Sequence, residues 1–170
     1  MFDLRKLTKT LLGILGLVVV AWAVETALTV WAWRSRNPRA LHLIKHFNKQ
    51  VLNPLMLRFS GRSGLSAIVH HVGRRSGTPY ATPVIAHQAE DVIIPLPYGT
   101  DVDWLHNLMA TGHAVVDLEG ASLTVDQPTV VDIDDVIALL PATMVRTVRF
   151  NGAREAVRMR VSGTAATPFA

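Results

Sequence analysis

The sequence predicts a mainly β domain, a small antiparallel barrel with helices packed outside it, preceded by one N-terminal transmembrane helix. Three observations predict this architecture. The chain has 170 residues and is 49% hydrophobic, which suffices for one core but not for two. Short runs of alternating apolar and polar residues recur between turn signals, as antiparallel strands require. A long apolar run precedes them, between Lys9 and Arg34.

The apolar run extends from Thr10 to Trp33, and Glu25 is its only charged residue. As a helix, its 24 residues would extend ~36 Å at ~1.5 Å per residue, enough to span the hydrocarbon core of a bilayer. More basic residues follow the run than precede it, so we expect a single-pass protein of the cell membrane with its domain in the cytoplasm. The alternative is a cleaved signal peptide, because Ala21-Trp22-Ala23 fits a cleavage site.

A second, amphipathic helix is predicted directly after the membrane segment. Asn37 and Pro38 suit the cap and first position of a helix, and apolar residues recur behind them at helical spacing as far as Leu55. The sequence Ser60-Gly61-Arg62-Ser63-Gly64 then indicates a linker. The domain proper therefore begins near residue 65.

The first half of the domain is predicted to be an antiparallel meander. Alternation of apolar and polar residues indicates three strands with short connections. The strands are expected over Ser66–Val72, Ala81–Gln88 and Val92–Leu96, joined by the loop Gly73–Tyr80 and a tight turn at Glu90-Asp91.

The second half is predicted to alternate helices and strands. A helix is expected from Asp101, as its cap, to about Ala110, with Gly112 at its C-terminal end. A hairpin of two strands, a helix with acidic residues in its first turn and a last strand complete a barrel of about six strands. These elements are expected over His113–Leu118, Ser122–Asp126, a helix starting near Asp132 and Glu155–Val161.

Charge is segregated along the chain. Residues 34–75 contain nine Lys or Arg and no acid, whereas residues 76–145 contain ten acids and no Lys or Arg. Such a basic block is either an unevenly charged surface or a surface that attracts anionic lipid or a phosphorylated ligand. Since aromatic residues are not interleaved with it, we expect no nucleic-acid partner.

Metal and cysteine chemistry are not expected. The chain has no cysteine, which excludes disulfides, thiolate ligands and cysteine nucleophiles. His42 and His46 have the spacing of metal ligands on a helix but no evident third ligand. His70 and His71 are expected on opposite faces of one strand, so they cannot form one site together.

The loop Gly73–Tyr80 is the strongest candidate site. Arg74, Arg75 and Ser76 offer two guanidinium groups and a hydroxyl between flexible glycines, a combination that can hold an oxyanion such as phosphate. The alternative is an ordinary solvated hairpin loop.

This loop is also part of a resemblance to a known family. The run Val72–Val84, the segment Tyr98–Asn107 and the sequence Ala110-Thr111-Gly112 resemble, in this order, the deazaflavin-dependent nitroreductase family. Members of that family are split β-barrels that bind coenzyme F-420. The similarity covers about Leu65 to Val161. It implies a split β-barrel of about six antiparallel strands with peripheral helices.

The resemblance also implies a set of site residues. Apart from the resemblance, we expect the Tyr98 hydroxyl to act as proton donor or to orient the acceptor. The implied cofactor-binding residues hold the phosphate and acidic tail, lie along the ring or close the site; they are Arg74, Arg75, Ser76, Gly77, Thr82, Pro83, Val84, Pro97, Gly99, Trp104 and Asn107.

The sequence departs from the better-known nitroreductases at the acceptor side. Tyr98-Gly99 stands where they carry a Ser-x-Gly-Gly segment, the lysine before the tryptophan is missing, and their C-terminal tyrosine has no counterpart. The substrate of those enzymes therefore does not carry over with the cofactor.

We predict a membrane-anchored oxidoreductase that transfers a hydride from reduced coenzyme F-420 to menaquinone, a nitro compound or another lipophilic acceptor. FMN is the alternative cofactor, and a homodimer is compatible with this function. The other readings are a non-catalytic barrel that binds a flavin, haem or lipid, and a structural domain without a ligand. The predicted parts are an anchor (1–36), a helix and linker (37–64), the cofactor-binding domain (65–162) and a disordered tail (163–170).

Overall fold

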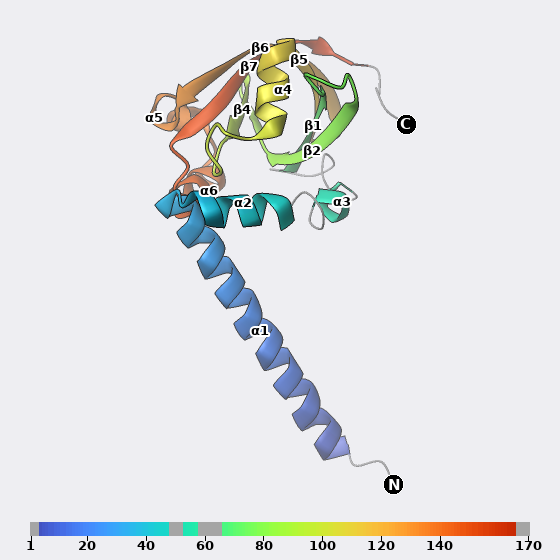
Figure 1. Ribbon diagram of the computed structural model, residues 1–170, viewed down its shortest axis with the longest axis vertical. Coiled ribbons are helices and arrows are strands. Elements are labelled where there is room, and N and C mark those ends of the chain that lie inside the picture. The colour runs from blue at the N-terminus through green and yellow to red at the C-terminus, as the bar shows by residue number, and fades with distance from the viewer. Residues whose placement is uncertain (1–3, 48–52, 58–65, 166–170) are drawn as a thin grey trace.

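In the computed structural model, residues 4–47, 53–57 and 66–165 are described. Helix α1 (Leu4–Ser35) extends away from the domain, and α2 (Pro38–Phe47) turns to lie along the base of the domain, followed by the short α3 (Asn53–Met56) (Figure 1). The turn between α1 and α2 uses the predicted cap, because Asn37 Oδ1 accepts hydrogen bonds from the backbone N–H groups of Arg39 (3.1 Å) and Ala40 (3.2 Å). The linker Ser60–Gly64 lies outside the described residues.

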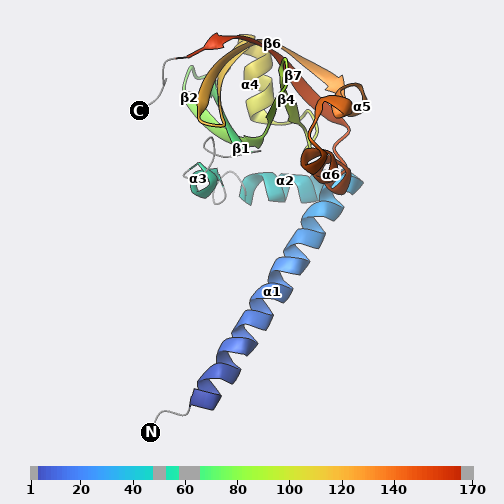
Figure 2. The same ribbon diagram turned by 180° about the vertical axis from the view of Figure 1, so that it is seen from behind.

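Seven strands form one antiparallel sheet in the order β2-β1-β5-β6-β7-β4-β3. Because the two edge strands β2 and β3 are separated only by the buried residue Ala86, the sheet curls until its edges lie close together (Figures 1 and 2). The predicted mainly β fold, a curled antiparallel sheet with peripheral helices, is confirmed. The strands are β1 (Ser66–Val72), β2 (Pro79–Ile85), β3 (His87–Gln88), β4 (Val92–Pro95), β5 (His113–Leu118), β6 (Ala121–Asp132) and β7 (Glu155–Thr164).

The main core fills the inside of this curl. Helix α4 (Asp103–Thr111) covers it and contributes the buried residues Leu105 and Leu108. The strands contribute alternate residues, such as Val157 and Met159 of β7, as expected where successive side chains point to opposite faces. The helix ends as predicted at Gly112, which adopts the left-handed conformation with φ of 75°.

A second, smaller core lies on the outer face of the sheet, under α5 (Ile133–Val136), the 3-10 helix η2 (Ile137–Leu139) and α6 (Ala142–Asn151). Asp132 caps α5, because its Oδ1 accepts a hydrogen bond of 2.9 Å from the backbone N–H of Asp134. Helix α6 was not predicted, although its buried residues Met144 and Val148 have helical spacing. Beta strand residues Ile93 and Ala156 complete this core.

Three expectations about ends of elements need correction. Helix α4 begins at Asp103 rather than after a cap at Asp101, because Lys45 of α2 binds both the backbone oxygen and the carboxylate of Asp101. The predicted disordered tail (163–170) is wrong at its start, since Gly163 and Thr164 still pair with β6; residues 166–170 lie outside the described residues. The strand predicted as Ala81–Gln88 is interrupted at Ala86, where the sheet turns.

The predicted transmembrane span from Thr10 to Trp33 has no support here. In the described part of the chain, no helix is both long enough and apolar enough to cross a membrane.

Candidate functional site

The loop between β1 and β2 is closed by its own hydrogen bonds. Gly73 N–H donates to the carbonyl oxygen of Thr78 at 2.8 Å, and Gly77 N–H donates to that of Gly73 at 2.9 Å. Ser76 Oγ accepts from the backbone N–H of Thr78 at 3.2 Å. A Cβ atom at Gly73 would lie 2.6 Å from Ser76 Oγ and 2.9 Å from the Tyr80 ring, so only glycine allows this packing. The loop is therefore a compact turn that presents its remaining donors to solvent.

A polar cluster lies where this hairpin meets α4. His71 is buried at 6% exposure, and its Nε2 lies 3.0 Å from Thr82 Oγ1 on β2. Its Nδ1 lies 3.3 Å from the amide nitrogen of Asn107 on α4. Because an amide N–H can only donate, Nδ1 accepts and the imidazole proton lies on Nε2, which donates to Thr82. The ring also stacks on Tyr80, with centroids 5.7 Å apart.

His71 is a neutral hydrogen-bonding group at neutral pH. Burial is the main cause that lowers its pKa from 6.5 to about 4; the neighbouring His70 acts in the same direction and Asp103 in the opposite one. Desolvation dominates because the charged imidazolium loses more hydration energy than the neutral ring. His71 can therefore hold Thr82 and Asn107 in place without bringing a charge into the cluster.

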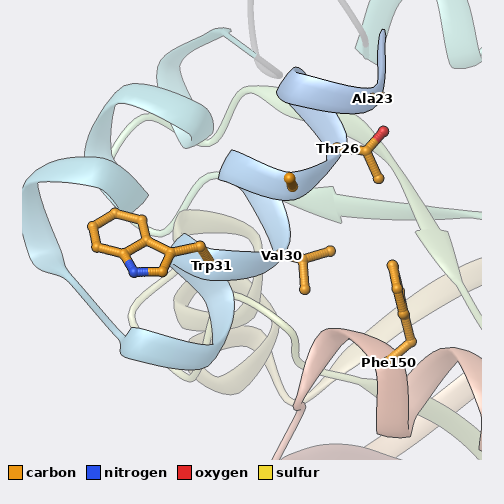
Figure 3. A pocket seen from close by; sticks show the side chains of 6 residues that line it. Ala23, Thr26, Val30, Trp31 and Phe150 are labelled. Atoms are coloured by element: carbon orange, nitrogen blue, oxygen red, sulfur yellow. The ribbon is translucent and has the colours of Figure 1, made fainter. Parts of the chain in front are cut away.

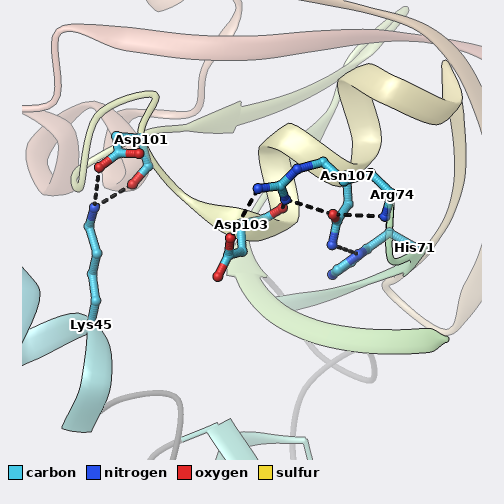
Figure 4. A network of polar contacts seen from close by, with 6 residues as sticks. All are labelled: Lys45, His71, Arg74, Asp101, Asp103 and Asn107. Atoms are coloured by element: carbon cyan, nitrogen blue, oxygen red, sulfur yellow. Dashed lines mark hydrogen bonds and ion pairs between the residues drawn. The ribbon is translucent and has the colours of Figure 1, made fainter. Parts of the chain in front are cut away.

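Arg74 joins the loop to α4 (Figure 4). Asn107 Oδ1 accepts hydrogen bonds from the backbone N–H of Arg74 at 3.1 Å and from its Nη1 at 2.9 Å. The guanidinium also lies 3.5 Å from the Asp103 carboxylate. Sequence reasoning expected both arginines to grip one anion from two sides. In the structure, Arg74 instead binds Asn107 and so connects the loop to helix α4.

Arg75 and Ser76 differ from Arg74 in that they face solvent. Both residues are exposed, and the Arg75 guanidinium has no carboxylate within ion-pair distance among the described residues. The backbone N–H groups of Arg75 and Ser76 likewise donate to no acceptor in the described part of the chain. Two backbone donors and one guanidinium in a tight turn are suited to an anion.

Strand β2 divides the other predicted cofactor residues between its two faces. Tyr80, Thr82 and Val84 lie on the same face of β2. Tyr80 and Thr82 contact His71, and Val84 packs on the main core. Pro83 lies between them and therefore on the opposite face. Thr82 and Val84 therefore share a face of β2 that the Pro83 ring does not share.

The segment Pro97-Tyr98-Gly99 lies against the end of α1. The ring of Tyr98 makes an edge-to-face contact with Trp33, with centroids 5.5 Å apart. Gly99 has φ of 74°, and a Cβ atom there would collide with the guanidinium of Arg36. Tyr98 is thus held by α1 and is not part of the polar cluster around His71. Trp104 is half-buried and packs on the main core.

His70 belongs to a separate contact on the other face of β1, as predicted. Its Nε2 lies 2.7 Å from Asp117 Oδ2, and Ser122 Oγ donates to the other oxygen of the same carboxylate at 2.6 Å. Because serine and histidine both bind the aspartate and not each other, this group does not have the order of a hydrolase triad.

Sequence reasoning missed His71 and Tyr80 as site residues. The predicted strand began at Ala81 and left Tyr80 in the loop, whereas β2 begins at Pro79 and its register places Tyr80 opposite His71. Sequence alone could not predict the contact between His71 and Asn107, because Asn107 lies on a helix 36 residues further along the chain.

The two hollows described on the surface lie elsewhere. One is lined by α1 and Phe150, and the other by residues around the ends of α1, α5 and α6. We therefore locate the candidate site by its chemistry, on the open surface at the β1–β2 loop, rather than by a cavity.

Comparison with known proteins gives only distant similarity. No family model matches the chain, and no curated protein matches it. A protein of unknown function from Agrobacterium tumefaciens is 14% identical over 62% of this chain and 52% of its own, with a TM-score of 0.41. The match thus spans about half the length of that protein.

Two solved structures with F-420 in their names also match. An F-420-H2-dependent reductase, FDR-A, is 13% identical over 56% of this chain and 94% of its own, with a TM-score of 0.42. An F-420 reductase is 14% identical over 59% and 89%, with a TM-score of 0.40. Similarity at this level does not assign a function.

Proposed function

We propose that this protein is a deazaflavin-type oxidoreductase that holds reduced coenzyme F-420 at the β1–β2 hairpin and reduces a lipophilic acceptor. The proposal is based on the turn at Arg75-Ser76, whose backbone N–H groups and guanidinium are available as hydrogen-bond donors to an anion. The turn leads into β2, where Tyr80 and Thr82 contact the neutral His71. The sequence resemblance of Val72–Val84 to the deazaflavin-dependent nitroreductases adds the choice of cofactor.

The donor set fits such a cofactor. A phosphate and carboxylates need cationic and N–H donors, which the turn provides through Arg75 and the backbone of residues 75 and 76. A flat ring needs an apolar or aromatic surface, and 45% of Tyr80 remains exposed beside Thr82. FMN, the alternative cofactor, carries the same phosphate chemistry. When bound, the deazaflavin supplies the hydride, so few catalytic side chains are required of the protein.

Each site residue then has a physical task. Arg75 and Ser76 bind the anionic tail, while Arg74 and Asn107 fix the turn against α4. His71 orients the Thr82 hydroxyl, and Val84 and Trp104 exclude water from the inner side. We assign to the Tyr98 hydroxyl the donation of a proton to the acceptor, near the end of α1.

The acceptor and the location remain predictions from the sequence. The apolar run Thr10–Trp33 favours a membrane-soluble acceptor such as menaquinone and a protein held at the cytoplasmic side of the membrane. Homodimerisation is likewise a prediction.

The proposal is tested by binding and turnover with the full-length protein in neutral detergent. We expect it to bind F-420 and to oxidise the reduced cofactor in the presence of menaquinone. Arg75→Ala should weaken F-420 binding roughly ten-fold, because it removes a charge-assisted contact. Arg39→Ala, which removes another exposed charge, from α2, should change the affinity less than about two-fold.

Two further measurements separate the roles. A cofactor without phosphate and acidic tail should bind the Arg75→Ala variant and the parent almost equally. Tyr98→Phe should lower turnover while leaving F-420 affinity unchanged. Binding of F-420 or FMN without turnover of any acceptor would favour a non-catalytic binding module, and failure to bind either cofactor would refute the proposal.

A further inference from the structure

An apolar groove lies between α1 and α6, away from the β1–β2 loop. It has a volume of about 500 Å³, and Figure 3 shows Phe150 of α6 extending toward the face of α1 that carries Val30. Trp31 and Phe150 are more than half exposed, at 53% and 56%. The lining residues are Ala23, Thr26, Ala27, Val30, Trp31 and Phe150. Large apolar side chains that remain this exposed favour an apolar occupant.

A polar pocket of about 560 Å³ is lined by residues from the ends of α1, α5 and α6. It is lined by three arginines, Arg34, Arg149 and Arg154, and by Asp132 and Asp134. Arg34 follows Trp31 by three residues on α1, and Arg149 precedes Phe150 on α6. On both α1 and α6, residues that line the groove are thus close in sequence to residues that line the pocket.

Arg34, which lines the polar pocket, contacts the backbone of Phe150, which lines the apolar groove. Its Nη1 donates hydrogen bonds to the backbone oxygens of Arg149 at 3.0 Å and Phe150 at 3.3 Å. Gly152 makes this approach possible, since a Cβ atom there would lie 3.0 Å from Arg34 Cγ. The guanidinium is thereby held at the boundary between the apolar groove and the polar pocket.

The charges of the polar pocket favour an anion. Within the described residues, neither Arg149 nor Arg154 has a carboxylate in ion-pair distance. Asp132 already accepts the backbone N–H of Asp134 as the cap of α5. Three arginines against two aspartates leave the pocket with an excess of one positive charge, which one phosphodiester would balance.

We propose that this amphipathic groove binds a phospholipid with one net negative charge, with an acyl chain against Val30, Trp31 and Phe150 and the phosphate among the three arginines. A phospholipid has an apolar tail next to a charged head group, and Phe150 of the apolar groove likewise contacts Arg34 of the arginine pocket. The site shares no residue with the proposed cofactor site, so the two proposals stand or fall separately.

The test uses the full-length protein in neutral detergent and short-chain phospholipids as probes, with binding measured by calorimetry. Dioctanoyl phosphatidylglycerol should bind at least roughly ten-fold more tightly than dioctanoyl phosphatidylcholine, because only the former leaves a net charge for the arginines. Glycerol 3-phosphate, which has the phosphate and no tail, should show no measurable binding.

Matched variants locate the site. Arg149→Gln with Arg154→Gln should lower phosphatidylglycerol affinity at least roughly ten-fold. Arg39→Gln with Arg146→Gln, which removes two exposed charges outside the pocket, should change it less than about two-fold. Phe150→Ala should weaken binding, whereas Leu139→Ala, a similarly exposed residue outside the groove, should not.

Three results would overturn the proposal. Equal binding of both phospholipids would exclude the arginine pocket as the head-group site. Equal losses in the two double variants would indicate general attraction to a basic surface. Tight binding of glycerol 3-phosphate would indicate a phosphate site that needs no lipid. All variants should show the thermal unfolding midpoint of the parent within a few degrees, since the changed side chains are exposed.

Discussion

At the scale of single residues, His71 connects the three elements of the candidate site. It lies on β1, donates to Thr82 on β2 and accepts from Asn107 on α4. Because Asn107 uses its oxygen to bind Arg74, the conformation of the β1–β2 turn depends on a chain of contacts that starts at a buried imidazole. A proton on Nδ1 would break that chain, since two donors cannot share a hydrogen bond.

The first prediction at this scale concerns pH. Burial lowers the pKa of His71 to about 4 in the folded protein, against 6.5 for the ordinary side chain. As pH falls below about 6.5, the unfolded chain takes up a proton that the folded protein refuses until about pH 4. The free energy of unfolding should therefore decrease between these values, by at most about 3 kcal/mol from this residue.

Urea unfolding at pH 7 and at pH 4.5 measures this effect. His71→Gln removes the titrating group while keeping hydrogen-bonding atoms, so its loss of stability between the two pH values should be smaller than that of the parent protein. His42→Gln, at an exposed position of α2, should behave like the parent. An unchanged pH dependence in His71→Gln would show that the imidazole is not protected from protonation as described.

At the scale of elements, helices α4 and α6 end with the same backbone conformation, but the two ends have different neighbours. Both are followed by a glycine in the left-handed conformation, Gly112 with φ of 75° and Gly152 with φ of 71°. Gly112 has open space where a side chain would lie, whereas Gly152 is packed against the Arg34 side chain of α1. The end of α6 is therefore part of the contact that holds α1 to the domain.

This difference predicts unequal costs of the same substitution. Gly112→Ala should lower the free energy of unfolding by about 1 kcal/mol, the usual cost of a positive φ for alanine. Gly152→Ala should cost more, because its methyl group would also lie 3.0 Å from Arg34 Cγ and disturb the hydrogen bonds to the last carbonyls of α6. Chemical denaturation of both variants checks the order, and equal losses would contradict the contact between Arg34 and α6.

At the scale of the whole molecule, α1 is joined to the domain only near its C-terminal end in the described residues. Ala32 is fully buried, Trp33 contacts Tyr98, Arg34 binds α6 and Arg36 lies 3.3 Å from Glu155 of β7. Leu15 and Leu17, earlier in the helix, are 59% and 71% exposed. The domain and the distal part of α1 thus contribute separately to the properties of the chain.

Removing residues 1–22 tests this separation. The domain should keep its stability within about 1 kcal/mol, because the contacts that hold α1 lie beyond the deletion. The membrane prediction has a distinct readout: the full chain should stay with membranes after alkaline carbonate extraction, and the shortened chain should be released. A large loss of stability on deletion would instead mean that the distal part of α1 packs on the domain.

The sequence by itself determined those features that depend on neighbouring residues. Strand β1 occupies the predicted residues Ser66–Val72 because the alternation of side chains is a local property of the backbone. The cap at Asn37 and the end of α4 at Gly112 likewise follow from single residues. Strand β6 extends to Asp132, beyond the predicted end at Asp126, because the structure accommodates Pro128 at an irregularity in the strand pairing between Asp126 and Thr129.

The tertiary structure alone decided how the candidate site residues divide their roles. The motif could not distinguish Arg74 from Arg75, and only the position of α4 directs one guanidinium to Asn107 and leaves the other in solvent. It also placed Tyr98 against Trp33, 65 residues earlier in the chain, rather than beside His71. The physical reason is that such contacts depend on how the sheet curls and on where helices lie across it, and these are set by packing between distant segments rather than by local pattern.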